Sequence, residues 1–147
     1  MKKMNNKGFS LVELIVVIAI MAVLIGVLAP QFLKYVERSR KSTDVQNVAA
    51  IVTACDTYAA DPMVTTPLKT GETITLKRGG TTSITAGGTT NTIELALLDA
   101  GIKSYGLKSK NWGTGDLTLT VTVTNGVPSY AVTGCAAGND ILAGTYE

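Results

Sequence analysis

The most prominent pattern in the chain is an uninterrupted apolar stretch near the N-terminus. Residues 14–33 carry no charge, and Gln31 is the only side-chain amide among these 20 residues. At about 1.5 Å per residue, a helix of this length spans roughly 30 Å, which is the hydrocarbon thickness of a bilayer. A core helix of a soluble domain is the alternative, but such a helix is usually apolar on one face only. The pattern therefore predicts a membrane-spanning helix over residues 9–33.

The next segment is amphipathic. Apolar residues recur at the 3-4-3-4 spacing that places them on one helix face: Val45, Val48, Val52, Cys55 and Ala59. Asp44 and Asp56 fall outside this face. Pro62 disfavours helical geometry at Asp61, so the helix is predicted to end there. Residues 34–61 are therefore predicted to continue the helix, with one face ready to receive a small domain.

The clearest element in the remaining region, 62–147, is a β-hairpin. Residues 117–124 alternate strictly between apolar side chains and threonine, and they are followed by Asn125-Gly126, a type I′ turn sequence. A two-residue loop fixes the register, which pairs Leu119 with Val132, Val121 with Tyr130 and Val123 with Pro128. One face of the hairpin is then apolar, and we expect it to lie on the helix.

Other elements of this Thr- and Gly-rich region are shorter. Residues 73–76 alternate as a strand, and the sequences Arg78-Gly79-Gly80 and Gly87-Gly88 are typical of turns. Residues 92–100 resemble a short helix capped by Thr92 and ended by Gly101, with its leucines facing inward: Leu95 and Leu98. Together these patterns predict an α+β fold, a long N-terminal helix packed against a small antiparallel β-sheet head.

Composition adds little evidence for chemistry. The chain of 147 residues has a net charge of +2, no histidine and two cysteines, which are too few for a zinc site. Strings typical of phosphate-binding loops, metalloproteases or serine hydrolases are absent from the sequence. We therefore expect no enzymatic activity, no cofactor and no metal site.

A small basic and aromatic cluster lies late in the chain: Lys103, Tyr105, Lys108, Lys110 and Trp112. It suggests contact with nucleic acid or a partner. However, residues 45–147 contain six Lys and Arg against eight Asp and Glu, so a solvated loop is favoured and nucleic-acid binding is expected to be weak or absent.

Glu13 does not fit a plain membrane anchor, because apolar residues flank it on both sides. A carboxylate well inside a bilayer costs about 2.5–3.5 kcal/mol on insertion scales, so it usually has a partner and a function. The alternative is that Glu13 rests at headgroup level. Cleavage between Gly8 and Phe9 would create a cationic α-amine four residues before Glu13.

The string Lys7-Gly8-Phe9-Ser10-Leu11-Val12-Glu13-Leu14 resembles the class III signal of type IV prepilins and pseudopilins. The resemblance covers residues 1–40 and implies a leader, 1–8, that a prepilin peptidase removes after Gly8. It further implies N-methylation of Phe9, and pairing of Glu13 with the terminal amine of the preceding subunit during assembly. The implied fold is the pilin-like lollipop, a helical stem carrying the head.

By this resemblance the chain is a structural subunit of an extracellular type IV pilus, with a role in adhesion, motility or DNA uptake. Its implied partners are identical subunits in a helical homopolymer, the prepilin peptidase and methyltransferase, the assembly platform and, before assembly, membrane lipid. The precursor is expected to span the inner (cytoplasmic) membrane once, with the leader cytoplasmic and the head outside. Two alternatives stay open, a pseudopilin of a secretion or competence machine and a single-span adhesin that never polymerises.

Gly26 and Pro30 are a candidate site of helix loosening. Proline lacks the N–H that would bond the carbonyl of Gly26, four residues back. The two alternatives are a simple kink, and a segment that kinks or melts when subunits pack into a filament. The family often has a glycine where this sequence has Ala22, so the place of any loosening differs here.

Cys55 and Cys135 are a candidate disulfide, because both are expected outside the membrane and they are the only pair. Such a bridge would fasten the C-terminal segment to the helix. The hairpin register argues against it, since residue 135 has the parity of the polar face. The alternative is two free thiols.

Overall fold

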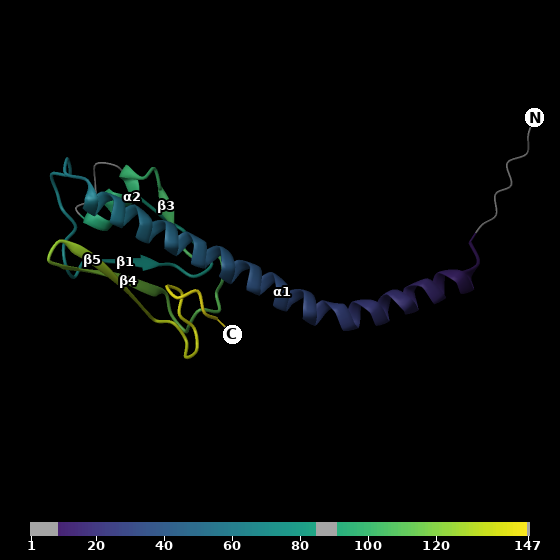
Figure 1. Cartoon of the computed structure of the whole chain (residues 1–147). Helices are drawn as coiled ribbons and strands as arrows, with labels where there is room; N and C mark the ends of the chain where they lie inside the picture. The colour runs from purple at the N-terminus through teal and green to yellow at the C-terminus, as the bar shows by residue number, and fades with distance from the viewer. Residues whose placement is uncertain (1–8, 85–90, 147) are drawn as a thin grey trace, which may run out of the picture. The chain divides into compact units, whose positions relative to one another are not determined.

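The computed structural model describes residues 9–84 and 91–146. The expected leader, 1–8, and the turn expected at 87–88 lie outside the described residues. The chain forms two compact units, one ending at Glu37 and one beginning at Arg38. Helix α1 (Leu11–Ala60) contributes residues to both units, and it ends directly before Asp61, as the position of Pro62 predicts (Figure 1).

In the second unit, one face of α1 is buried, but it is rotated from the predicted one. Its buried residues from position 41 onward are Lys41, Asp44, Val48, Ile51, Ala54, Cys55 and Tyr58. Val45 and Val52 are only half-buried and Ala59 is exposed, so their assignment to the centre of the face is wrong. The face includes the polar Lys41 and Asp44 because both have partners in the head, which hydropathy alone does not reveal.

The head contains a three-stranded antiparallel sheet in the order β1-β4-β5, formed by β1 (Thr73–Leu76), β4 (Leu117–Thr124) and β5 (Val127–Thr133). The predicted hairpin register is confirmed, with Leu119 opposite Val132 and Val123 opposite Pro128. Asn125 and Gly126 have φ values of 53° and 80°, as a type I′ turn requires. The apolar side chains of β4 face inward, which leaves the threonines on the wetter face.

Helix α2 (Thr92–Asp99) lies where a short helix is predicted, but two details differ. Its N-cap is Asn91, whose side chain accepts a 3.0 Å bond from the N–H of Ile93. The hydroxyl of Thr92 bonds the carboxylate of Glu72 instead, so Thr92 is not the cap. The buried side chains of α2 are Thr92, Ile93, Ala96 and Leu97, while Leu95 and Leu98 pack only at the edge of the core.

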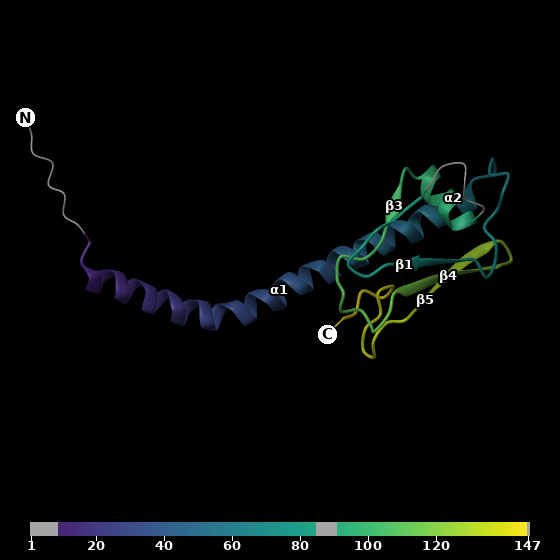
Figure 2. The same cartoon turned by 180° about the vertical axis from the view of Figure 1, so that it is seen from behind.

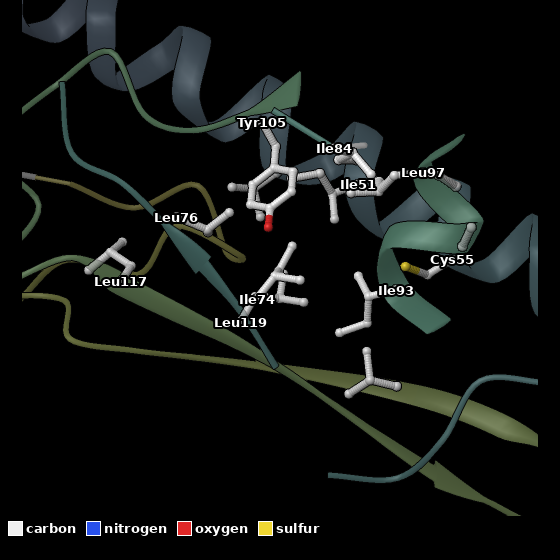
Figure 3. Close-up of a cluster of buried hydrophobic side chains, with 14 of the residues drawn as sticks. Ile51, Cys55, Ile74, Leu76, Ile84, Ile93, Leu97, Tyr105, Leu117 and Leu119 are labelled. Carbon is white, nitrogen blue, oxygen red and sulfur yellow. The ribbon is translucent and has the colours of Figure 1, made fainter. Parts of the chain in front are cut away.

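The core of the head gathers side chains from four elements. Figure 3 shows Ile51 and Cys55 of α1, Ile74 and Leu76 of β1, Leu117 and Leu119 of β4, and Ile93 and Leu97 of α2 pointing toward one another. A short ladder of β2 (Thr82–Ser83) and β3 (Ser104–Tyr105) adds Tyr105 to this core. Figure 2 shows α2 and the sheet beside the C-terminal part of α1. The α+β fold with a long N-terminal helix and an antiparallel head is thus confirmed.

Candidate functional site

The first turn of α1 is built around Ser10 and Glu13. The Oε2 atom of Glu13 accepts a 2.9 Å bond from the N–H of Ser10, and the carbonyl of Ser10 accepts a bond from the N–H of Leu14. The first N–H groups of a helix lack partners within the helix, and a carboxylate in the first turn also complements the positive end of the helix dipole. Glu13 therefore caps its own helix, in addition to any role toward another molecule.

The Ser10–Glu13 contact has a signal in the sequence. The string Ser10-Leu11-Val12-Glu13 has the S-x-x-E spacing of a capping box and directly precedes the apolar run. A carboxylate has two oxygens with room for about four hydrogen bonds, so the bond to Ser10 leaves capacity for a further cationic donor. The side chain of Glu13 is exposed, which makes that capacity accessible.

Phe9 precedes the helix and is 88% exposed, whereas Gly8 lies outside the described residues. The large apolar side chains that follow Phe9 in the first unit share this exposure. From Leu11 to Tyr35, the exposed large apolar side chains each retain about half or more of their accessible surface. A surface of this kind exceeds the apolar patches that soluble monomers usually carry, and it requires a bilayer or other protein to cover it. By length and composition, α1 is able to cross a membrane.

Gly26 and Pro30 lie within the continuous helix α1. A Cβ atom added at Gly26 would meet no atom within 4 Å, so packing inside this chain does not require a glycine there. Glycine and proline are both weak helix formers, so the helix is intrinsically less stable at these two positions. Local melting upon assembly stays a prediction.

Asp44 is a buried carboxylate that the hydropathy pattern does not reveal. It is completely buried, and its carboxylate accepts bonds from the N–H of Lys108, the N–H of Ser109 and Nε1 of Trp112, at 2.5, 2.9 and 2.8 Å. Three donors compensate for the desolvation of the charge. This carboxylate thereby holds the loop after β3 against α1.

Lys41, one helical turn earlier, is also buried. Its Nζ lies 5.4 Å from the ring centre of Trp112 and 5.7 Å from that of Tyr146, and it donates a 3.3 Å bond to Oδ1 of Asn139. The two rings meet edge to face with centres 5.8 Å apart. Cation–π contacts of this kind stabilise a desolvated ammonium, so Lys41 fastens the C-terminal segment to α1.

The candidate disulfide is not formed, because Cys55 and Cys135 are both free thiols. Cys135 lies near Trp112, whose carbonyl accepts a bond from the N–H of Ala136, and Trp112 in turn bonds Asp44. Cys55 follows Asp44 by 11 positions, which corresponds to about 16 Å of helix. Cys55 is completely buried in the core of the head, whereas Cys135 packs at the edge of that core.

The residues of the predicted basic and aromatic cluster do not lie on one common surface. Lys103, Lys108 and Lys110 are exposed, whereas Tyr105 and Trp112 are buried in the head. Tyr105 uses its hydroxyl to bond Glu94 at 2.8 Å. Among the residues that the structure describes, no group of three or more His, Cys, Asp or Glu could hold a metal ion.

Comparisons with known proteins match the N-terminal region. Residues 3–29 match the family described as "Prokaryotic N-terminal methylation motif". The chain is similar to the type IV major pilin protein PilA of Myxococcus xanthus, with 36% identity over 57 residues, 39% of this chain and 26% of the relative. It is also similar to prepilin peptidase-dependent protein A of Clostridium perfringens, with 45% identity over 64 residues, 42% of this chain and 45% of the relative.

A third relative is the type IV major fimbrial protein FimA of Dichelobacter nodosus, with 36% identity over 59 residues, 40% of this chain and 38% of the relative. Each of these alignments therefore spans less than half of the relative's length. No solved structure matches the chain.

Proposed function

We propose that this chain, whose N-terminal region is similar to that of type IV pilins, is a structural subunit of an extracellular type IV pilus. The observation that carries the proposal is the apolar surface of α1 from Leu11 to Tyr35, which is uncovered within the chain and begins at a capped, acidic first turn. A bilayer covers this surface in the precursor, and the same segments of other subunits cover it in the filament.

Processing prepares the subunit for assembly. The leader, residues 1–8, is removed between Gly8 and Phe9 by a prepilin peptidase, and the new amine of Phe9 is then methylated. Glycine at the cleaved bond gives the peptidase a flexible backbone and no side chain to accommodate. A methylated amine keeps its positive charge, so Phe9 stays able to pair with a carboxylate. Residues 9–33 then act as the membrane and assembly segment, 34–61 as the helix that carries the head, and 62–147 as most of the head.

Glu13 sets the register of assembly. Its carboxylate caps its own helix through Ser10 and offers its remaining capacity to the amine of Phe9 in a neighbouring subunit. Either charge alone is unfavourable in an apolar bundle, and a bonded pair avoids that cost in only one docking register. Packing of the apolar helices supplies most of the adhesion, and Gly26 and Pro30 let the helix adjust as subunits pack.

The proposed partners follow from this cycle. They are identical subunits, the prepilin peptidase and methyltransferase, the assembly platform, and membrane lipid before assembly. The precursor sits in the cytoplasmic membrane with its leader inside and its head outside, and the assembled subunit is extracellular.

Substitution of Glu13 tests the proposal. Glu13→Ala removes the carboxylate, and we expect normal processing and membrane insertion but at least a tenfold loss of surface filaments, counted by electron microscopy. Glu13→Gln keeps a hydrogen-bond acceptor for Ser10 but no charge, so it separates capping from charge pairing, and we expect it to assemble as poorly as Glu13→Ala.

Asp99→Ala is the matched control, because it removes an exposed carboxylate from the head. We expect it to leave filament number unchanged. Wild-type filament numbers in Glu13→Ala cells, or an equal loss in Asp99→Ala cells, would contradict the assembly role of Glu13. A chain that is inserted and processed but never found in filaments would contradict the pilus proposal itself.

A further inference from the structure

A hollow with basic walls lies in the second unit, between α1 and two loops of the head. It has a volume of about 420 Å³ and is lined by Ser39, Arg40, Thr43, Gly79, Lys108 and Lys110. Three of these six residues are cationic, and none of the six is acidic. The hydroxyl of Thr43 donates to the carbonyl of Ser39, so the lining combines three positive charges with the hydroxyl of Ser39, a donor set that suits phosphate oxygens.

The two lysines of the hollow are presented by a fixed loop. Leu107 and Ser109 are buried, whereas the alternate residues Lys108 and Lys110 are exposed, so the loop directs both ammonium groups outward. On one side, Asp44 binds the N–H groups of Lys108 and Ser109. This anchor holds the backbone beneath the lysines at the wall of α1.

A second anchor fixes the same loop from the strand side. The guanidinium of Arg78 donates to the carbonyls of Lys110, Gly113 and Thr114, and the backbone of Arg78 is bonded to Asp116. Next to Arg78, Gly79 has a φ of +64°, and the side chain of Lys110 crosses so close that a Cβ at Gly79 would lie 2.6 Å from its Cε. The hollow is therefore preorganised, which lowers the entropy cost of binding a ligand.

The position of the hollow along the chain indicates the source of the phosphate. Arg40 follows Leu33, the end of the expected membrane segment, by seven positions. A precursor anchored through this segment therefore holds Arg40 within reach of lipid headgroups on the outer side of the membrane. Basic groups near a membrane surface attract anionic lipid.

We propose that this hollow binds the phosphate of an anionic phospholipid headgroup while the precursor is in the membrane. The inference rests on the membrane-anchored precursor of the proposed function. In the bound state, Lys108, Lys110 and Arg40 supply the charge, and the hydroxyl of Ser39 donates a hydrogen bond to a phosphate oxygen. Extraction of the subunit into a filament releases the lipid, so the contact holds the head at the membrane before assembly.

Native mass spectrometry of the full chain in detergent tests the proposal with phosphatidylglycerol and phosphatidylcholine as probes. We expect at least a fivefold preference for phosphatidylglycerol in the parent chain. Lys108→Ala/Lys110→Ala should abolish this preference, and the single variants Lys108→Gln and Lys110→Gln should each reduce it. The matched control is Lys69→Ala/Lys103→Ala, which removes two exposed lysines elsewhere in the head and should keep the preference.

The emission of Trp112 verifies that each variant is folded, since this residue is the only tryptophan of the chain. Equal retention of the two lipids, or an equal loss in the control pair, would overturn the proposal. Displacement of phosphatidylglycerol by inorganic phosphate at equal concentration would assign the hollow to free phosphate instead. Displacement by a short DNA strand would assign it to nucleic acid, and either result would refute the lipid proposal.

The lipid-binding measurement needs no filament, so a negative result would refute the lipid proposal without affecting the proposed pilus role. A loss of filament assembly would likewise not change the result of the lipid-binding measurement. Flotation of the precursor with vesicles of pure phosphatidylcholine tests the anchor separately. We expect the parent chain and both double variants to float equally.

Discussion

Nε1 of Trp112 donates a 2.8 Å hydrogen bond to Oδ2 of Asp44, and both side chains are completely buried. This bond joins α1 to a loop 68 residues later in the chain. Because the same carboxylate also binds two backbone N–H groups, Asp44 organises the loop that carries Lys108 and Lys110. The packing of the head on α1 therefore depends on one buried charge as well as on apolar contacts.

Replacement of Asp44 should destabilise the head strongly. Asp44→Ala leaves three donors without their acceptor, and an unsatisfied buried polar group costs about 1–3 kcal/mol. We expect a loss of at least about 3 kcal/mol in the free energy of unfolding, measured by urea denaturation with Trp112 emission as the probe. Asp99→Ala, which removes an exposed carboxylate, should change stability by less than about 0.5 kcal/mol. Similar stabilities of the two variants would show that the Asp44 bonds contribute little.

Two nearby glycines should respond differently to alanine. A Cβ at Gly113 would lie 1.9 Å from the carbonyl oxygen of Gly134, whereas a Cβ at Gly115 would meet no atom within 4 Å. Gly113→Ala must therefore move the end of β5, and we expect a destabilisation of about 2 kcal/mol or more from overpacking. Gly115→Ala should be close to neutral in the same urea titration. Equal tolerance of both changes would mean that the 113–134 contact is not formed in solution.

The two cysteines should differ in reactivity. Burial, with a smaller contribution from the charge of Asp56, raises the pKa of the Cys55 thiol from 9.0 to about 12. Alkylation of the native chain at pH 8 should therefore modify half-buried Cys135 far faster than Cys55. The denatured but unreduced chain should take up two labels. No label in the denatured monomer would demonstrate a disulfide and contradict the free thiols.

The hydroxyl of Tyr130 on β5 donates a 2.6 Å bond to Oδ1 of Asp56 on α1. Burial, this bond and the neighbouring charges raise the pKa of Tyr130 above its usual 10.0. Because the folded state keeps the proton more tightly, this contribution to stability is complete below pH 10 and declines as the pH rises above 10. Tyr130→Phe should lower stability at pH 7 by about 1 kcal/mol and flatten the alkaline decline.

The control for Tyr130 is Tyr35→Phe, which alters an exposed tyrosine outside the head. Its urea midpoint should equal that of the parent chain at every pH from 7 to 11. An unchanged alkaline decline in Tyr130→Phe would assign the pH dependence to other groups, such as Tyr105 with its bond to Glu94.

Local periodicity accounts for the parts of the fold that the sequence predicts well. Strict alternation and Asn125-Gly126 determine the register of β4 and β5, because both signals are local. The assignment of the α2 cap failed because Asn91 and Thr92 are both good caps, and the choice depends on Glu72, 20 residues away. Asp44 was missed for the same reason, since its partners lie 64 to 68 residues away. The Ser10–Glu13 cap, by contrast, had a local signal.

The N-terminus of the subunit recovered from sheared surface filaments is the most direct test of the proposed function. Intact mass and N-terminal fragmentation should identify a chain that lacks residues 1–8 and begins with N-methylated Phe9. Such a result joins processing, modification and presence in the filament in one measurement. A filament subunit that begins at Met1, or that has been cut after Ala29, would contradict the account, as would filaments that lack this chain.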